Sequence, residues 1–206
     1  DLHSFPTRRS SDLHIAVALT DKLTDERFLE VGHQQPSQQT PEVFEAVVYQ
    51  AALALQALGV TDGVTHSEFR LTPRGPLLIE THTRMGGGSL HVLTQLTTGV
   101  DLADLMVAFG LGEQPDVQPA QPACGAAIRF LLGRPGRIAG VEAPTAGAAD
   151  GVVAVLLPAA GRTVSGRSAS RERLGHVIAT GPTAEAAGRA AIWRSEERRV
   201  GKECRS

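Results

Sequence analysis

Apolar residues recur along two neighbouring stretches, residues 67–72 (SEFRLT) and 76–81 (PLLIET). Alternation with a period of two is typical of a β-strand with one buried face. Pro73-Arg74-Gly75 lies between the two stretches, and this composition favours a tight turn. The pattern therefore predicts an antiparallel hairpin whose strands pair about Arg74.

In this register the carboxylates of Glu68 and Glu80 lie opposite each other. Like charges across a ladder repel, so the pair costs free energy unless a cation or a shared proton lies between them. A divalent metal is the simplest remedy. The other pairs divide between two faces: we expect His66 opposite His82 and Arg70 opposite Leu78 on the ionisable face, and Phe69 with Ile79 and Leu71 with Leu77 on the apolar face.

Helical periodicity follows in several places. Thr40 can cap a helix, Pro41 suits its first turn and Gly59 can end it. This helix should cover one face of the hairpin through residues at helical spacing: Val43, Phe44, Val47, Val48, Ala51, Leu55 and Leu58. We predict further helices at 89–98, from 101 to about 110 and from about 183, and strands at 14–20, 124–132, 151–158 and 175–181.

A proline-rich polar stretch, residues 113–122, interrupts these patterns, and such stretches usually connect packed units. We therefore predict a first domain at 14–115, a linker at 116–123 and a small lobe at 124–193. The expected fold class is α+β: an antiparallel sheet with packed helices, followed by a small β-rich C-terminal lobe.

The two ends, residues 1–13 and 194–206, show no apolar periodicity. Both can be written as translations of one DNA sequence read on opposite strands, which we recognise as a sequencing-library adapter. We interpret both segments as adapter-derived artefacts and exclude them from fold reasoning. On this interpretation the chain is a fragment, and we expect the native protein to be longer.

Setting the ends aside changes the charge. They hold 7 of the 20 basic and 5 of the 22 acidic residues, which leaves 13 and 17 in residues 14–193, a net charge of −4. A mildly acidic domain is poorly suited to sequence-independent nucleic-acid binding. Cys124 remains as a single thiol, interpreted as a small buried hydrophobe, so no internal disulfide can form. Without a signal peptide or a long apolar run, we expect a cytoplasmic protein that does not bind membranes.

Candidate phosphate chemistry follows the hairpin. Arg84 precedes Gly86, Gly87 and Gly88, and a predicted helix opens near Ser89. Glycines leave backbone N–H groups unobstructed, and a helix N-terminus offers a partial positive charge to an anion. Together with a metal between the two glutamates, these residues indicate a site for phosphate.

These motifs resemble the C-terminal half of an ATP-grasp ligase, in which an acidic residue on one strand and a Glu-x-Asn-x-Arg signature on the next hold the magnesium ions of the nucleotide. Here Glu68 is followed by Glu80-Thr81-His82-Thr83-Arg84. The segment Glu30-Val31-Gly32-His33 with Pro36, the glycine run and residues 98–102 resemble the carboxylate–amine ligase branch that includes the L-amino-acid ligases. The later lobe resembles the C-terminal domain of that branch.

The resemblance implies a two-step reaction, in which ATP phosphorylates a carboxylate and an amine displaces phosphate from the acyl phosphate. It implies Glu68 and Glu80 as metal ligands, Arg84 as the catalytic residue on the transferring phosphoryl group, and Gly86–Gly88 as a phosphate or carboxylate cradle. Glu30 and His33 would face the amino acid and the incoming amine. The expected cofactors are ATP and Mg²⁺, with Mn²⁺ as an alternative because His82 replaces the usual asparagine, either as a ligand or as a partner of one.

Other interpretations stay open. The two glutamates could face water, Arg84 could form a surface ion pair, Gly86–Gly88 could be an ordinary loop, and His33 and His66 could be structural. The alternative functions are a biotin-carboxylase or purine-ligase type of ATP-grasp enzyme and a non-catalytic relative. The segment 30–33 favours amino acids as the small-molecule partners, and a homodimer stays open. The upstream half of an ATP site would precede His14, so we expect the fragment alone to be inactive.

Overall fold

The computed structural model describes residues 2–8, 14–118, 121–133, 135–140, 151–164 and 173–196, with the backbone alone for 2–8 and 193–196. The chain forms two compact units. The first comprises Asp1–Lys22 and Gln35–Cys124, and the second comprises Leu23–Gln34 and Gly125–Ser206. The boundary after Cys124 falls at the end of the predicted linker, whereas residues 23–34, grouped with 14–115 by the sequence analysis, pack in the second unit.

In the first unit the strand order is β5-β4-β1-β2. These strands are β1 (Leu2–Arg8), β2 (His14–Thr24), β4 (His66–Thr72) and β5 (Gly75–His82), and the neighbouring pairs are antiparallel. Residues 1–13, interpreted from the sequence as an adapter-derived artefact, contain β1, which pairs with both β2 and β4. The register of β1 shifts between Ser4 and Pro6, where proline has no N–H to donate.

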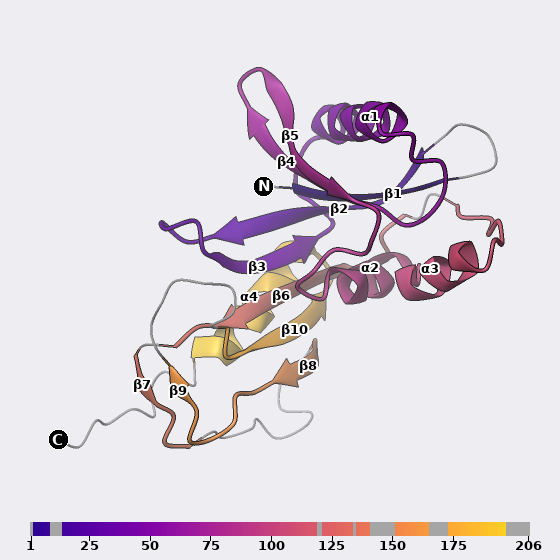
Figure 1. The fold of residues 1–206 in the computed structure, drawn as a ribbon. Coiled ribbons are helices and arrows are strands. Elements are labelled where there is room, and N and C mark those ends of the chain that lie inside the picture. The colour runs from indigo at the N-terminus through magenta and orange to yellow at the C-terminus, as the bar shows by residue number, and fades with distance from the viewer. Residues whose placement is uncertain are drawn as a thin grey trace. The chain divides into compact units, whose positions relative to one another are not determined.

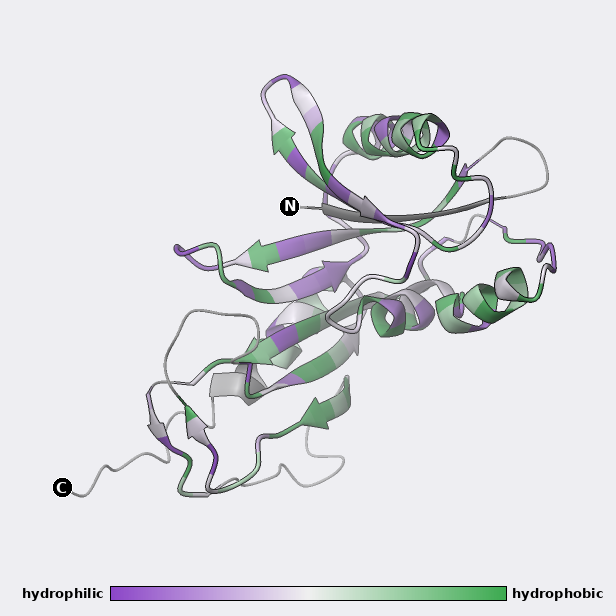
Figure 2. Cartoon of the chain, in the orientation of Figure 1, coloured by the Kyte–Doolittle hydropathy of each residue, from purple (hydrophilic) through white to green (hydrophobic). Residues whose placement is uncertain are grey.

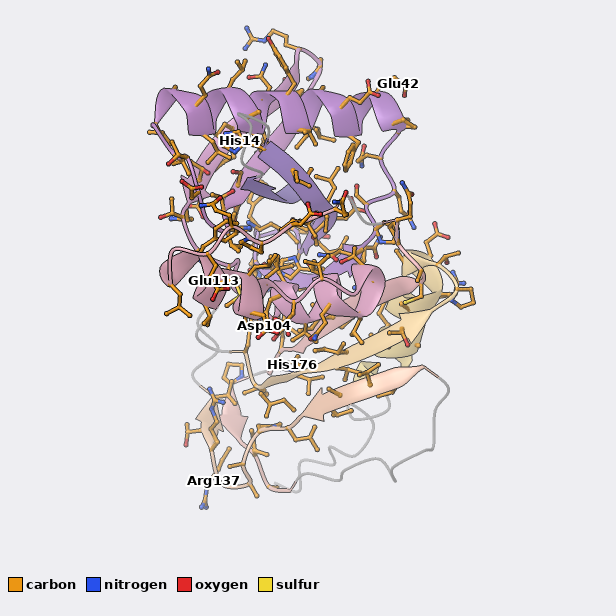
Figure 3. The ribbon with its side chains drawn as sticks, turned by 90° about the vertical axis from the view of Figure 1, so that its right-hand side faces the viewer. His14, Glu42, Asp104, Glu113, Arg137 and His176 are labelled. Carbon is orange, nitrogen blue, oxygen red and sulfur yellow. The ribbon has the colours of Figure 1, made fainter. Side chains whose placement is uncertain are left out.

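Helix α1 (Pro41–Ala57) packs against this sheet, as Figure 1 shows. Thr40 caps it by accepting from the Val43 N–H, and the hydrogen bond from Thr40 lowers the pKa of Glu42 in the first turn (Figure 3). Its buried residues are Val47, Ala51 and Leu55. The predicted buried face of this helix was too wide, because Phe44 is 37% and Leu58 is 64% exposed.

The core under α1 joins three elements of the first unit. Leu19 of β2, Val47 and Ala51 of α1 and Phe69 of β4 form one buried cluster, and Leu78 of β5 packs against it. Phe69 has no exposed surface. Burying such side chains removes about 25 cal/mol of unfavourable hydration per Å² of apolar surface, which fixes the inner face of the hairpin.

Helices α2 (Leu90–Thr98) and α3 (Leu102–Gly110) begin and end near their predicted limits. Gly99 ends α2 with φ of 77°, and the Asp101 carboxylate caps α3 by accepting from the Ala103 and Asp104 N–H groups. No single helix in the described ranges is long and apolar enough to cross a membrane; α2 and α3 pass that test only together, and they are bent by 105°.

Buried polar side chains anchor α2 to β2. The Gln35 Nε2 group donates to Thr20 Oγ1 at 2.6 Å and to Thr94 Oγ1 at 3.2 Å, while Thr97 Oγ1 donates to Gln35 Oε1 at 3.1 Å. All four residues are buried. The amide of Gln35 is therefore satisfied on both its oxygen and its nitrogen.

In the second unit the strand order is β3-β6-β10-β8. These strands are β3 (Glu30–Gln35), β6 (Gly125–Leu131), β10 (Gly175–Gly181) and β8 (Val152–Leu156), with a small pair of β7 (Gly136–Arg137) and β9 (Thr163–Val164). Helix α4 (Ala184–Glu196) packs on β6 and β10. Figure 2 shows that β8 consists of hydrophobic residues along its length. The predicted α+β class with a small β-rich lobe is confirmed.

Candidate functional site

The hairpin of β4 and β5 brings the two predicted metal ligands together. Glu68 pairs with Glu80, and His66 pairs with His82, as the register predicted. Between them the Ser67 and Thr81 hydroxyls lie 2.7 Å apart and hydrogen-bond across the strands. The ionisable residues therefore face each other across one ladder.

The register closer to the turn differs from the prediction. Thr72 pairs with Gly75 around a two-residue loop, so Phe69 pairs with Leu78 and Arg70 with Leu77. The ladder shifts by one residue between Glu68 and Phe69, which leaves Ile79 as the extra residue of a bulge. The shift restores the predicted pairing at Glu68 because it compensates for the shorter loop.

The bulge also changes which side chains are buried. Leu78, predicted on the ionisable face, packs against the core, while Leu77 and Ile79, predicted on the apolar face, are 58% and 54% exposed. The predicted pairs Phe69 with Ile79 and Leu71 with Leu77 are therefore wrong. A two-residue loop fits the twist of a hairpin better than the three-residue turn assumed from the sequence.

Each carboxylate has a basic neighbour. Lys22 Nζ of β2 lies 2.8 Å from Glu68 Oε2, and His66 Nε2 lies 3.5 Å from Glu68 Oε1. On β5, His82 Nε2 lies 3.2 Å from Glu80 Oε1. Glu68 and Lys22 are 18% and 17% exposed, whereas Glu80 is 47% exposed. A lysine therefore supplies a positive charge at Glu68, where a divalent metal was predicted as the simplest of the possible cations.

The donor set fits a magnesium ion. Mg²⁺ is usually bound through one or two carboxylates, and substrate phosphates and water complete its octahedral shell. Glu68 and Glu80 supply such carboxylates from paired strands, and His82 lies beside the more exposed one. No group of three His, Cys, Asp or Glu side chains in the described ranges converges as a complete metal cage. Any ion would therefore depend on ligands from outside these side chains.

The glycine run after the hairpin has unequal roles. Gly86 is buried, and a Cβ there would lie 2.8 Å from Leu90 Cδ1 and 2.9 Å from the His66 ring, whereas a Cβ at Gly87 would meet nothing within 4 Å. Gly88 has φ of 64°, a conformation that suits glycine. Packing thus explains why position 86 is a glycine, and backbone conformation explains position 88. Neither explains the glycine at position 87.

Arg84 precedes this run on an exposed loop. Its Nη1 group donates to the Met85 carbonyl oxygen at 2.8 Å. The side chain is exposed, and an arginine carries five N–H donors, so this contact leaves donors for a ligand. The geometry is compatible with a phosphate ligand, and the catalytic role of Arg84 stays a prediction.

Glu30 and His33 lie in the second unit, where they contact each other. Glu30 also accepts from Arg173 Nη2. The Arg173 guanidinium lies over the Phe130 ring at 3.7 Å, and the His33 ring meets Phe130 edge-on at 5.7 Å. Glu30, His33 and Arg173 thus form one cluster around an aromatic ring, which we call the Phe130 cluster.

The electrostatics of this cluster keep Glu30 ionised. Burial raises the pKa of its carboxyl, but the hydrogen bond and charge of His33 and the charge of Arg173 outweigh it and bring the pKa to about 2. At neutral pH Glu30 is a carboxylate that can hold a cation. It is too weak a base to remove a proton from an ammonium group.

A buried arginine supports the strand that carries His33. Arg129 donates from Nη1 to the His33 carbonyl oxygen and from Nη2 to Gln34 Oε1, at 3.0 Å each. Gly188 of α4 gives its guanidinium room, because a Cβ there would meet Nη2. Sequence reasoning missed Arg129, Arg173 and Lys22; Lys22 was the one with a signal, as the single lysine of residues 14–193.

Known proteins resemble this chain in sequence. Residues 129–197 match the family described as L-amino acid ligase C-terminal domain 2. The uncharacterized protein y4rH of Sinorhizobium fredii is 31% identical over 154 residues, 74% of this chain and 32% of that protein. Carnosine synthase 1 of Mus musculus is 39% identical over 108 residues, 52% of this chain and 12% of that protein. The chain therefore spans a third or less of these relatives.

Solved structures share the fold. An L-amino acid ligase from Bacillus licheniformis superposes with a TM-score of 0.82 at 19% identity, over 96% of this chain and 52% of that one. Phosphoribosylglycinamide synthetase from Anaerococcus prevotii superposes with a TM-score of 0.77 at 15% identity, over 91% of this chain and 49% of that one. The third structure is the biotin carboxylase domain of Hydrogenobacter thermophilus 2-oxoglutarate carboxylase, solved with MgADP, ADP and bicarbonate. It superposes with a TM-score of 0.70 at 18% identity, over 93% of this chain and 44% of that one.

These matches bear on both units. Each solved structure is covered to about half of its length. The resemblance predicted from the motifs is confirmed: this chain has the fold of the C-terminal part of an ATP-grasp ligase, and residues 129–197 of its second unit match the model of the L-amino acid ligase C-terminal domain 2.

Proposed function

We propose that the chain is the C-terminal part of an ATP-dependent carboxylate–amine ligase, which forms an amide or peptide bond through an acyl phosphate. One observation carries the proposal: Glu68 faces Glu80 across a hairpin in a chain with an ATP-grasp fold. Two facing carboxylates are costly in a purely structural hairpin and useful in a site for a metal nucleotide.

The residues divide the work between binding and charge stabilisation. Glu68 and Glu80 would hold Mg²⁺, with Mn²⁺ as an alternative, and His82 would orient Glu80 or add a ligand. A bound metal would neutralise the phosphate oxygens of ATP. Arg84 would hold the phosphoryl group through its planar fork, and Gly87, which has open space around it, would present its backbone to phosphate.

The substrate side of the proposal rests on the second unit. Glu30 and His33 would contact amino-acid substrates, since Glu30 is a carboxylate held ionised beside an imidazole. The similarity to carnosine synthase and to an L-amino acid ligase supports amino acids as the small-molecule substrates. The cytoplasmic location and a homodimer stay predictions.

The test is ADP release by the full-length protein with Mg²⁺, ATP and a mixture of amino acids. We expect release in the wild type and its loss, by at least about 100-fold, in Glu80→Gln. Glu113→Gln, at an exposed position outside the hairpin (Figure 3), is the matched control and should keep full activity. Equal activity in Glu80→Gln would exclude the metal assignment. Release that depends on bicarbonate instead of an amine would indicate a carboxylase-type enzyme, and no release in the wild type a non-catalytic relative.

A further inference from the structure

Arg173 has no role in the reaction proposed above, yet both a carboxylate and an aromatic ring hold it in place. Its Nη2 group donates to Glu30 Oε2, and its guanidinium is held 3.7 Å above the Phe130 ring. The side chain is 18% exposed and that of Glu30 is 20% exposed. Both ends of this ion pair are therefore largely desolvated and still reachable by a small ligand.

The pair is held from several sides. Phe130 is only 8% exposed, its face attracts the guanidinium cation, and the His33 ring packs against it in a T-shaped arrangement. On β3 the His33 backbone is fixed by Arg129, whose Nη1 group donates to its carbonyl oxygen. A charge pair fixed in this way loses little conformational entropy when a ligand binds.

The guanidinium has donors to spare. An arginine side chain carries five N–H donors, and the described contact with Glu30 uses Nη2. Arg173 Nε is buried and has no hydrogen-bond partner among the described residues. Arg173 can therefore accept a second anion, and Glu30, ionised at neutral pH, can accept a second cation.

We propose that Glu30 and Arg173 form a binding site for the zwitterion of an α-amino acid, with Glu30 on the ammonium group and Arg173 on the carboxylate. This inference rests on the proposed function and names the group that reads the substrate carboxylate. A zwitterion exchanges one internal ion pair for two intermolecular ones, so neither buried charge is left alone.

Ligands that carry a single charge fare worse at such a site. An amine that binds Glu30 would displace Arg173 and leave the guanidinium without an anion. A carboxylate that binds Arg173 would displace Glu30 and leave it without a cation. Unpaired buried charges reject a ligand more strongly than a missing apolar contact does. The site therefore selects for both charges on one small molecule, whatever its side chain.

The test compares L-alanine, ethylamine and propionate, which share a two-carbon CH3–C unit and differ in whether it carries an ammonium group, a carboxylate or both. Their binding to the full-length protein is measured by calorimetry and ligand-observed NMR without ATP or metal, so the result is independent of ADP release. We expect L-alanine to bind at least about ten-fold more tightly than either analogue. Arg173→Gln should lower the affinity for L-alanine to that of ethylamine and leave ethylamine binding no weaker, and Arg173→Lys should restore part of the difference.

Arg137→Gln is the matched control, because Arg137 is exposed in the same unit and, among the described residues, its side chain donates to the Gly161 carbonyl oxygen (Figure 3). It should bind L-alanine as the wild type does. Thermal melts establish that each variant is folded. The proposal is overturned if no alanine binding is seen in the wild type, if Arg173→Gln binds L-alanine normally, or if it loses L-alanine and ethylamine equally.

Discussion

The Lys22 ammonium group lies 2.8 Å from Glu68, the more buried of two carboxylates that face each other across the hairpin. The contact reduces the repulsion between Glu68 and Glu80 when no metal is bound. A metal ion bound as proposed would therefore compete with Lys22 for the same carboxylate. A ligand phosphate is a suitable new partner for the displaced ammonium group.

Replacing Lys22 by methionine should therefore tighten metal binding. A unit charge about 4 Å from another contributes an interaction energy of about 1 kcal/mol in bulk water and about 4 kcal/mol near a protein surface. After screening, we expect Lys22→Met to lower the dissociation constant for Mn²⁺ by about ten-fold, as measured by electron paramagnetic resonance of free Mn²⁺.

Arg70→Met is the control for this measurement, since it removes an exposed charge from the same hairpin. Its Mn²⁺ affinity should stay within about two-fold of the wild type. Equal affinities in Lys22→Met and the wild type would show that Lys22 and the metal do not share Glu68. Glu80→Gln should abolish Mn²⁺ binding in either background.

The glycine run offers a matched pair of substitutions. Gly86→Ala places a methyl group 2.8 Å from Leu90 Cδ1 and 2.9 Å from the His66 ring, so we expect a loss of about 1–3 kcal/mol in the free energy of unfolding. Gly87→Ala meets nothing within 4 Å and should be neutral or stabilising by up to about 1 kcal/mol. Urea unfolding measures both.

Activity separates the two roles of the run. If Gly87 presents its backbone to phosphate, Gly87→Ala reduces ADP release by the full-length protein without reducing stability. A Gly87→Ala variant that is stable and fully active would argue that the run serves only packing and loop conformation.

The sequence predicted the facing carboxylates because alternation fixes which residues share a face. It missed the register near the turn because a two-residue loop followed by a bulge restores the same pairing at Glu68, and no local pattern distinguishes that path from a regular ladder. Ile79 is therefore exposed although its hydropathy favours burial.

Contacts between segments far apart in the sequence were also not predicted. Lys22 meets Glu68 across 46 residues and Arg173 meets Glu30 across 143, and no spacing rule connects such positions. The pairing of β1 is of the same kind: Leu2–Arg8 shows no apolar period, and the ladders to β2 and β4 run through backbone groups that every residue except proline supplies in full.

The buried amide of Gln35 should be one of the most sensitive positions in the first unit. Gln35→Ala leaves a cavity and removes the partner of Thr20 and Thr97, each of which is buried. We expect a loss of about 2–4 kcal/mol in the free energy of unfolding. Gln38→Ala, at an exposed position, should change it by less than about 0.5 kcal/mol. A neutral Gln35→Ala would mean that water replaces the amide at no cost.

The pH dependence of stability should report the Phe130 cluster. The pKa of Glu30 falls from 4.5 in the unfolded chain to about 2 in the folded one. Because the folded state favours the ionised form, this stabilisation is complete above about pH 5 and is lost as the pH falls from 4.5 towards 2. We expect it to be about 2 kcal/mol, since the side chain is partly exposed.

Glu30→Gln should therefore be less stable than the wild type at pH 7, because Arg173 loses its anion, and should lose less additional stability than the wild type between pH 5 and pH 3. Urea unfolding at several pH values measures the difference in slope, which does not depend on the absolute loss. Glu113→Gln, at an exposed carboxyl, should follow the wild-type slope. Parallel slopes for Glu30→Gln and the wild type would mean that His33 and Arg173 do not hold Glu30 ionised, and the site for a zwitterion would then lack its anionic half.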